Sequence, residues 1–160
     1  MSEDPKTKPI AALSVPPRTK TAYPAEFAGV TEGRAKRALG THFGLSQFGV
    51  NLTTLAPGAK TALRHWHSEE DEFVYVLSGE VTLVTNAGAA LMRAGDCMGF
   101  RAGTPDGHRI ENRGTSDAVL LEVGTRRPDI DQVHYPDDDL AVVPDGTGKR
   151  LFRRKDGTPV

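Results

Sequence analysis

Residues 63–79 read LRHWHSEEDEFVYVLSG, and this stretch decides the fold. Two histidines one residue apart, His65 and His67, precede a run of β-branched and aromatic residues, Phe73 to Leu77, which ends at a Ser-Gly turn. Such a run, bounded by a turn signal, indicates a strand. Positions i and i+2 of a strand share a face, so we expect both imidazoles to point to one centre and Trp66 to point away.

Short strand-like runs continue on both sides of this stretch. From residue 45 apolar and polar residues alternate, and Phe48, Val50 and Leu52 are expected to form the buried face of a strand that ends at Pro57-Gly58. Further strands are expected at 63–67, 73–77, 81–85, 90–93, 97–101, 108–111 and 118–123. Turn residues separate these runs. Seven or eight short strands predict an all-β domain, built as an antiparallel sandwich or barrel.

The two ends of the chain lack this pattern. Pro16-Pro17 excludes a helix, so the N-terminus is predicted to be a mobile arm or an extended strap lying on the body. Residues 31–39 have modest helical character, and residues 150–154 are expected to add one late edge strand. The expected boundaries are 1–22 for the arm, 23–125 for the barrel and 126–160 for a wrapping C-terminal segment.

Composition limits the classes of protein to which this chain can belong. The chain has 160 residues and fits one domain that buries roughly 70% of its unfolded surface without needing disulfides. Twenty basic and 21 acidic side chains give a formal net charge of −1, so no overall field recruits nucleic acid or an anionic membrane. The sequence contains one cysteine and no apolar run of membrane-spanning or signal-peptide length. We therefore expect a soluble, cytoplasmic protein.

The spacing of histidines and carboxylates predicts a metal site. Glu72 shares its strand parity with Val74 and Val76, which places its carboxylate inside the barrel with both histidines, and His108 begins a later strand on the opposite wall. Glu70 is the alternative carboxylate ligand. Imidazole and carboxylate donors suit one divalent transition metal per chain, which could be Fe, Mn, Ni, Zn or Cu.

Other reactive side chains have simpler interpretations. Cys97 is expected to be a small buried hydrophobe and not a thiolate ligand. Tyr75 has the opposite parity to Glu72 and should point away from the metal. The remaining cations are expected to be solvated surface more often than anion sites: Arg34, Lys36, Arg37, Arg93, Arg101, Arg109 and the run 153–155.

Over residues 45 to 124 the chain resembles a single-domain cupin. The first motif of that family matches Gly58, His65, His67, Glu72 and Gly79, and the second matches Gly95-Asp96, Phe100, Gly103, His108 and Asn112. The resemblance implies a double-stranded β-helix, the cupin jelly-roll barrel. It also implies that His65, His67, Glu72 and His108 bind the metal, that the glycines form turns and that Asn112 is structural. Four residues, where the motif has two, separate Gly103 from His108, which gives the site an additional loop.

The resemblance extends in part to function. The flanking segments are similar to a subgroup of small cupins, some of which are labelled sugar-phosphate isomerase-like. A metal-dependent enzyme acting on a small oxygen-rich metabolite is therefore expected, either an isomerase of a sugar or sugar phosphate or a dioxygenase, with Glu72 as the candidate catalytic residue. The alternative is a metal-binding or ligand-binding sensor without turnover, or a structural cupin. The doubly apolar run Phe73 to Leu77 and the terminal straps predict a homodimer.

Overall fold

The structure of the protein is a computed structural model, and it describes residues 8–160. Its strands pair antiparallel in three sheets. The first sheet has the order β1 (Arg34–Ala38), β2 (Phe48–Leu55), β9 (Ala118–Thr125), β4 (Glu72–Ser78), β7 (Cys97–Phe100). The second has the order β6 (Gly88–Arg93), β5 (Glu80–Thr85), β8 (Arg109–Glu111). The third has the order β12 (Arg150–Arg153), β11 (Leu140–Pro144), β10 (Val133–Tyr135), β3 (Trp66–His67).

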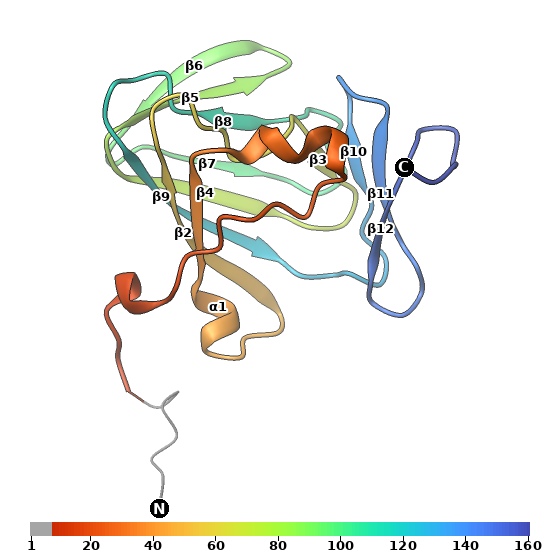
Figure 1. The fold of residues 1–160 in the computed structure, drawn as a ribbon, viewed down its shortest axis with the longest axis horizontal. Helices are drawn as coiled ribbons and strands as arrows, with labels where there is room; N and C mark the ends of the chain where they lie inside the picture. Colours follow the sequence, from red (N-terminus) through yellow and green to blue (C-terminus); the bar gives the residue numbers. More distant parts are fainter. Residues whose placement is uncertain (1–7) are drawn as a thin grey trace, which may run out of the picture.

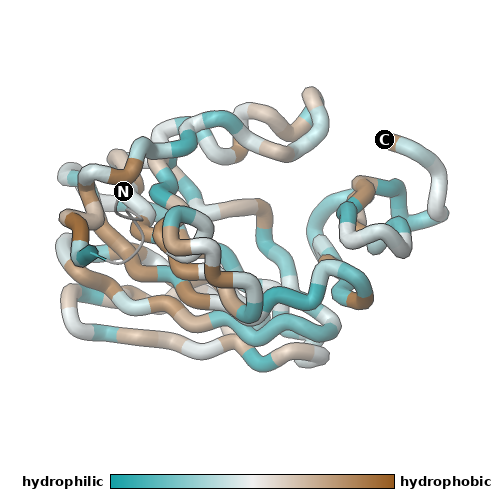
Figure 2. The backbone as a smooth tube through the Cα atoms, turned by 90° about the horizontal axis from the view of Figure 1, so that it is seen from below, coloured by the Kyte–Doolittle hydropathy of each residue, from teal (hydrophilic) through white to brown (hydrophobic). Residues whose placement is uncertain are grey.

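The first two sheets face each other and enclose the main core (Figure 1). The first sheet contributes Leu55, Val74, Val76, Ala118 and Leu120, and the second contributes Val81, Leu83, Met92 and Ile110. Apolar segments accordingly run through the stacked strands in Figure 2. This arrangement confirms the all-β prediction and shows a jelly-roll barrel, a double-stranded β-helix. Most expected strands lie within two residues of their predicted bounds.

The inner face of β2 is the opposite of the predicted one. Leu55 belongs to the core, and Asn51 and Thr53 share its parity, whereas Phe48 is 41% exposed on the outer face. Leu52 is buried, but on the outer side of the sheet. The predicted alternation is confirmed and its predicted direction is wrong, because the inner face of β2 also carries polar residues: Asn51 lines a cavity and Thr53 binds Glu122.

Residues 34–38 form a strand and not the helix that modest propensity suggested. Each residue of β1 pairs with a residue of β2, so tertiary pairing overrides local preference here. Lysine and arginine are typical of such an edge strand. The edge is also covered, since the amide of Arg18 donates to the Lys36 carbonyl at 2.8 Å and the Lys36 amide donates to the Arg18 carbonyl at 3.0 Å. The segment around Arg18 therefore lies against the body as a strap, while residues 1–7 of the expected arm lie outside the described part.

Three strands of the C-terminal segment join β3 in a third sheet beside the barrel (Figure 1). The edge strand expected at 150–154 is β12, but β10 and β11 were not predicted. A second core joins this sheet to the N-terminal region and consists of Val133, Tyr135, Leu140 and Val142 with Tyr23, Phe27, Leu63 and Phe152. Among the described residues, three short helices complete the fold: η2 (Ala12–Ser14), η3 (Ala25–Thr31) and α1 (Leu39–His42). Across residues 8–160, no helix has the length and apolarity to span a membrane.

Candidate metal centre

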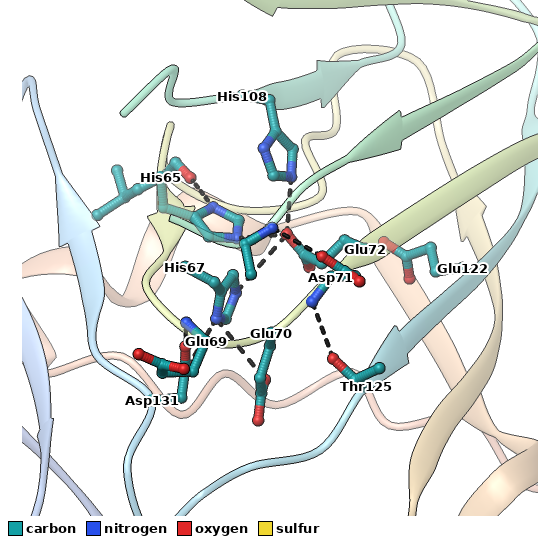
Figure 3. A network of polar contacts seen from close by, with 12 residues as sticks. His65, His67, Glu69, Glu70, Asp71, Glu72, His108, Glu122, Thr125 and Asp131 are labelled. Carbon is teal, nitrogen blue, oxygen red and sulfur yellow. Dashed lines mark hydrogen bonds and ion pairs between the residues drawn. The ribbon is translucent and has the colours of Figure 1, made fainter. Parts of the chain in front are cut away.

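Three elements bring the predicted ligands together at the open end of the barrel. His65 and His108 form an isolated antiparallel bridge, in which the two amides donate to the opposite carbonyls at 3.1 and 2.8 Å. His67 lies on β3, and Glu72 begins β4 on the neighbouring sheet. The side chains of all four residues point toward one another in Figure 3.

The three imidazoles approach a single carboxylate oxygen. The Nε2 atom of His108 lies 2.9 Å from Glu72 Oε2, and the Nε2 atoms of His65 and His67 each lie 3.6 Å from it. One donor atom from each of His65, His67 and Glu72 lies within 4.8 Å of the other two. His108 is not a member of this mutually close group and joins it through Glu72.

Hydrogen bonds on the far side of two imidazole rings fix which nitrogen faces the centre. His65 Nδ1 lies 2.8 Å from the Leu63 carbonyl oxygen, which can only accept, so Nδ1 carries the proton. His67 Nδ1 lies 2.7 Å from Asp131 Oδ2, another acceptor. In the neutral rings both Nε2 atoms therefore present lone pairs to Glu72. Such partners commonly orient histidines that bind metal.

The centre fits a divalent cation. Glu72 Oε2 is buried and has no hydrogen-bond partner of acceptable geometry among residues 8–160. Two 3.6 Å separations are too long for hydrogen bonds. Nitrogen and oxygen ligands about 2.1 Å from one cation lie roughly 3.0 to 3.5 Å apart, close to the observed spacing. An arrangement of lone pairs facing a buried carboxylate oxygen is repulsive unless a positive charge lies between them.

The protonation states of Glu72 and His108 agree with this interpretation. Burial opposes ionisation of Glu72, but the contacts with His108 and His65 outweigh it and hold the pKa well below its usual value. Burial lowers the pKa of His108, which keeps this ring neutral at neutral pH. An ionised carboxylate and a neutral imidazole are the forms that bind a metal.

Buried carboxylates surround the outer side of His67. Asp131 is fully buried and accepts a hydrogen bond from the Glu69 amide at 3.0 Å as well as from His67. Glu70 Oε2 lies 3.6 Å from His67 Nδ1, on the side of the ring away from Glu72. Arg150 binds both carboxylates, with its Nη2 in contact with Glu70 Oε1 and 3.3 Å from Asp131 Oδ2. Glu70 thus faces the outer nitrogen and Arg150, which favours Glu72 as the ligand.

These outer contacts balance the charges of the group. Burial alone would lower the pKa of His67, but the hydrogen bond to Asp131 and the charges of Glu72, Asp131 and Glu70 outweigh burial and raise it. Burial likewise opposes ionisation of Asp131, whereas His67, the Glu69 amide and Arg150 lower its pKa. Asp131 is therefore ionised and holds the His67 ring in place.

A cavity of about 890 Å³ opens beside the centre, between the first sheet and the C-terminal sheet. Glu122, on the inner face of β9, lies in it with Lys36 Nζ 3.2 Å from its Oε2 atom. Thr53 Oγ1 donates a hydrogen bond to the same oxygen. Glu72 pairs with Gly124, so Glu122 is a diagonal neighbour, about 7 to 8 Å from Glu72 between Cα atoms (Figure 3).

Three residues of the site were missed by the sequence analysis: Glu122, Asp131 and Arg150. Only Glu122 carried a signal, because it interrupts the inward apolar parity of Ala118 and Leu120. Asp131 and Arg150 reach the site because of how the C-terminal segment folds, and no local sequence pattern predicts that fold.

Several other predicted residues can now be placed. Cys97 is exposed, contrary to expectation, since it lies on the outer face of edge strand β7 opposite Tyr75. Tyr75 points away from the centre, as predicted, and is 37% exposed. Asn112 is buried and donates to the carbonyls of Leu55 and Ser116, both at 2.8 Å, in agreement with a structural role.

The remaining cations are mostly surface or paired residues. Arg101 is exposed, and Arg93 and Arg109 pair with glutamates. Arg34 and Lys36, however, line the cavity, contrary to the prediction of a solvated cluster.

Comparison with known proteins supports one family. The family model described as Cupin domain matches residues 51–124. A sugar phosphate isomerase from a cupin superfamily of Silicibacter pomeroyi shares 43% identity over 96% of both chains, with a TM-score of 0.90. A putative sugar phosphate isomerase from Acidithiobacillus ferrooxidans is 32% identical over 79% of this chain and 80% of the other, with a TM-score of 0.71.

More distant structures share the fold alone. A polyketide cyclase from Streptomyces resistomycificus is 20% identical over 74% of this chain and 78% of its own, with a TM-score of 0.61. The comparison with curated proteins gives no match. One barrel therefore supports different reactions, and reaction class must come from the site. The jelly-roll barrel, the two motifs and the two structures at 43% and 32% identity together show that the chain belongs to the cupin superfamily.

Proposed function

We propose that this protein is a metal-dependent isomerase of a small sugar phosphate. One divalent transition metal is held by His65, His67, Glu72 and His108. The observation that carries the proposal is the buried Glu72 Oε2, which has three imidazole nitrogens 2.9 to 3.6 Å away and no hydrogen bond of acceptable geometry among residues 8–160. The two structures that share 43% and 32% identity are both described as sugar phosphate isomerases, which favours this reaction over a dioxygenase.

The bound metal would act as a Lewis acid that polarises hydroxyl and carbonyl oxygens of the substrate. Interconversion of an aldose and its ketose also moves a proton between neighbouring carbons, and this step needs a base. Glu72 is the carboxylate in the centre itself. Glu122 is a second carboxylate on the same inner face, and it can accept and return a proton without leaving the cavity.

Lys36 and Thr53 position Glu122 for this role. The hydroxyl of Thr53 and the ammonium of Lys36 contact the same oxygen, Glu122 Oε2. The other oxygen, Oε1, has no hydrogen bond or ion pair within residues 8–160. Thr53 is fully buried, so its hydroxyl is fixed by the surrounding sheet. The free oxygen of Glu122 is the proposed site of proton transfer.

Metal content tests the first part of the proposal. Protein expressed with Fe, Mn, Ni, Cu and Zn supplied should purify with about one metal per chain. His67→Ala should remove most of the metal and leave the far-ultraviolet circular dichroism unchanged, because the core lies below the site. His42→Ala, which removes an exposed imidazole outside the cavity, is the matched control. Wild-type protein that remains free of metal under these conditions would contradict the proposal.

Turnover tests the second part. Metal-loaded protein is offered a panel of aldose and ketose phosphates in deuterated water, and isomerisation and deuterium incorporation are followed by NMR. Glu122→Gln should lower kcat by 100-fold or more, in the range of about 10²–10⁴ for loss of a general base, with metal content unchanged. Saturable binding of the sugar phosphates without conversion of any of them would indicate a binding or sensor protein instead.

A further inference from the structure

More cations than carboxylates line the cavity beside the metal centre. Four basic side chains line it, Arg34, Lys36, Arg126 and Arg150. Three acidic side chains line it, Glu70, Glu72 and Glu122. Asp131, which contacts His67 and Arg150 behind this lining, offsets the fourth cation, so a divalent cation at the centre would make the region net positive. A cleft with such a balance attracts anions and repels cations.

Most of these cations already have a partner. Lys36 is paired with Glu122, and Arg150 with Glu70 and Asp131. Arg34 donates to the carbonyl of Thr61, and its buried Nε atom has no hydrogen-bond partner among residues 8–160.

Arg126 differs from the other cavity cations because it is exposed and also unpaired, whereas Arg34, which likewise has no ion pair among residues 8–160, is partly buried. It is exposed at the cavity mouth, and within the described residues 8–160 it has no carboxylate partner. Its one side-chain hydrogen bond is long, 3.4 Å from Nη2 to Thr41 Oγ1. The backbone behind it is fixed, because the Arg126 amide donates to the Gln47 carbonyl at 3.1 Å. Its guanidinium is therefore the cation of the cavity that is most available to a ligand.

The sheet places this guanidinium in line with the metal centre. Gly49, Gly124 and Glu72 are direct neighbours across β2, β9 and β4, so they form one row on the inner face. A Cβ atom built on Gly49 would lie 3.1 Å from Arg126 Nε, which shows that the guanidinium lies over this glycine. Gly124 has no side chain to block the path to Glu72. Two interstrand spacings separate the ends of the row, roughly 10 Å.

We propose that Arg126 binds the phosphate group of the substrate while the sugar oxygens at the other end reach the metal centre. The proposal rests on the proposed function, because it names a specificity-determining residue of the same site. A planar guanidinium binds phosphate oxygens through two parallel hydrogen bonds, so it selects a phosphorylated sugar over the neutral sugar. Gly49 and Gly124 are required because a side chain at either position would occupy the path between the two ends.

Binding of inorganic phosphate to EDTA-treated full-length protein tests the anchor without turnover and without metal. Arg126→Ala should weaken phosphate binding at least 10-fold, as loss of a charge-assisted contact implies, and Arg126→Lys should restore part of it. Gly49→Ala keeps the charge but displaces the guanidinium, and should also weaken binding. The matched control is Arg127→Ala. It removes the same charge from the next residue, whose side chain pairs with Glu69 outside the cavity. Equal effects of Arg126→Ala and Arg127→Ala, or no effect of either, would overturn the proposal.

Metal-loaded protein then separates this proposal from the proposed isomerase activity. A pentose 5-phosphate, the unphosphorylated pentose and the corresponding aldonate are compared as ligands. Arg126→Ala should raise Kd and KM for the phosphate ester with little change in kcat and none in metal content, and should leave the neutral pentose unaffected. Wild-type protein that binds the ester through Arg126 without converting it would support the anchor and contradict the isomerase. Conversion with a KM that Arg126→Ala does not change, or tighter binding of the aldonate, would overturn the anchor.

Discussion

At the scale of single residues, the candidate centre depends on contacts made behind the ligands. The His67 ring is held by Asp131, a fully buried carboxylate 2.7 Å from Nδ1. This contact fixes the tautomer and makes Nε2 a better donor to a cation. Asp131 contributes no atom to the inner side of the centre, so its effect on metal binding is exerted through His67.

Asp131→Asn should therefore weaken metal binding by about 10 to 100-fold, the range found when a partner of a metal-binding histidine is changed. The measurement is competition with a chelating dye, with thermal unfolding of the metal-free proteins recorded in parallel. Asp137→Asn is the control, because it removes an exposed carboxylate that binds Arg64 outside the centre. An Asp131→Asn protein with the affinity of the wild type would show that the His67 ring is held by other contacts.

Glu111 gives a pH-dependent contribution to stability away from the centre. Burial opposes its ionisation, but hydrogen bonds from Arg113 and Arg109 outweigh burial and lower its pKa. A carboxyl group with a lowered pKa stabilises the fold above its unfolded pKa, and this stabilisation is lost as the pH falls through the folded value.

Glu111→Gln should thus cost about 1 kcal/mol of the free energy of unfolding at pH 7, because Arg113 is largely solvated. The difference from the wild type should narrow as the pH falls below 4.5, the ordinary value for this side chain. Urea unfolding at a series of pH values measures both effects. A difference that does not change with pH would mean that the carboxylate charge is not the cause.

At the scale of elements, the sequence predicted the strands of the barrel well because their signal is local. The runs from β4 to β9 combine strand-forming residues with Gly, Asn and Asp turns, and glycines at positions such as Gly79 (φ 76°) take a conformation that other residues rarely adopt. The candidate ligands were predictable for the same reason. The one-residue spacing of His65 and His67 places both imidazoles on one face, and the position of Glu72 at the start of β4 places its carboxylate on the inner face.

The elements that were missed depend on contacts distant in sequence. β1 looked weakly helical and becomes a strand because β2 pairs with all five of its residues. The predicted inward face of β2 is wrong for a related reason. Alternating apolar residues do not show which face of a strand packs on the core when the inner face also lines a polar cavity. Arg150 comes 80 residues after Glu70, and only the folded C-terminal sheet brings them into contact.

The C-terminal strand β12 should accordingly contribute to stability through Arg150. Its guanidinium neutralises two carboxylates, of Glu70 and Asp131, that are almost inaccessible to water. Arg150→Met would leave both without their cation and should cost about 2 kcal/mol in urea unfolding. Arg154→Met, which breaks the more exposed ion pair with Glu26, should cost about 0.5 kcal/mol. Equal losses would show that β12 stabilises the fold by packing and not through this charge network.

At the scale of the whole molecule, hydrophobicity is distributed unusually across the first sheet. Near the open end its inner face carries Asn51, Glu122 and Glu72, which line the cavity, and Thr53, which donates a hydrogen bond to Glu122. Its outer face carries exposed apolar side chains, Phe48, Phe73, Tyr75 and Leu77, with exposed fractions of 37 to 45%. Large apolar groups clustered on one face typically mark an interface with another protein.

We expect a second copy of this chain to cover this outer face, because two-fold homodimers are the commonest assemblies and need one self-complementary patch. A typical interface buries about 800 Å² on each partner, which a five-stranded sheet can supply. Light scattering should therefore give about twice the 17.2 kDa mass of one chain. A lysine placed among apolar groups at the contact would be buried without a partner, so the double substitution Phe73→Lys and Tyr75→Lys should produce monomers.

The control for this prediction lies on the opposite sheet. Leu91 on β6 is 48% exposed, and its neighbour Met92 is in the core, so Leu91 points outward from the second sheet. Leu91→Lys should leave the dimer intact, whereas dissociation by both sets of substitutions would place the contact elsewhere. The Phe73 and Tyr75 side chains lie on the opposite face of β4 from Glu72, so the monomeric variant should keep its metal and its affinity for phosphate. Loss of metal together with the dimer would mean that the second copy completes the site, and a monomeric wild-type protein would exclude the dimer while leaving the metal centre untouched.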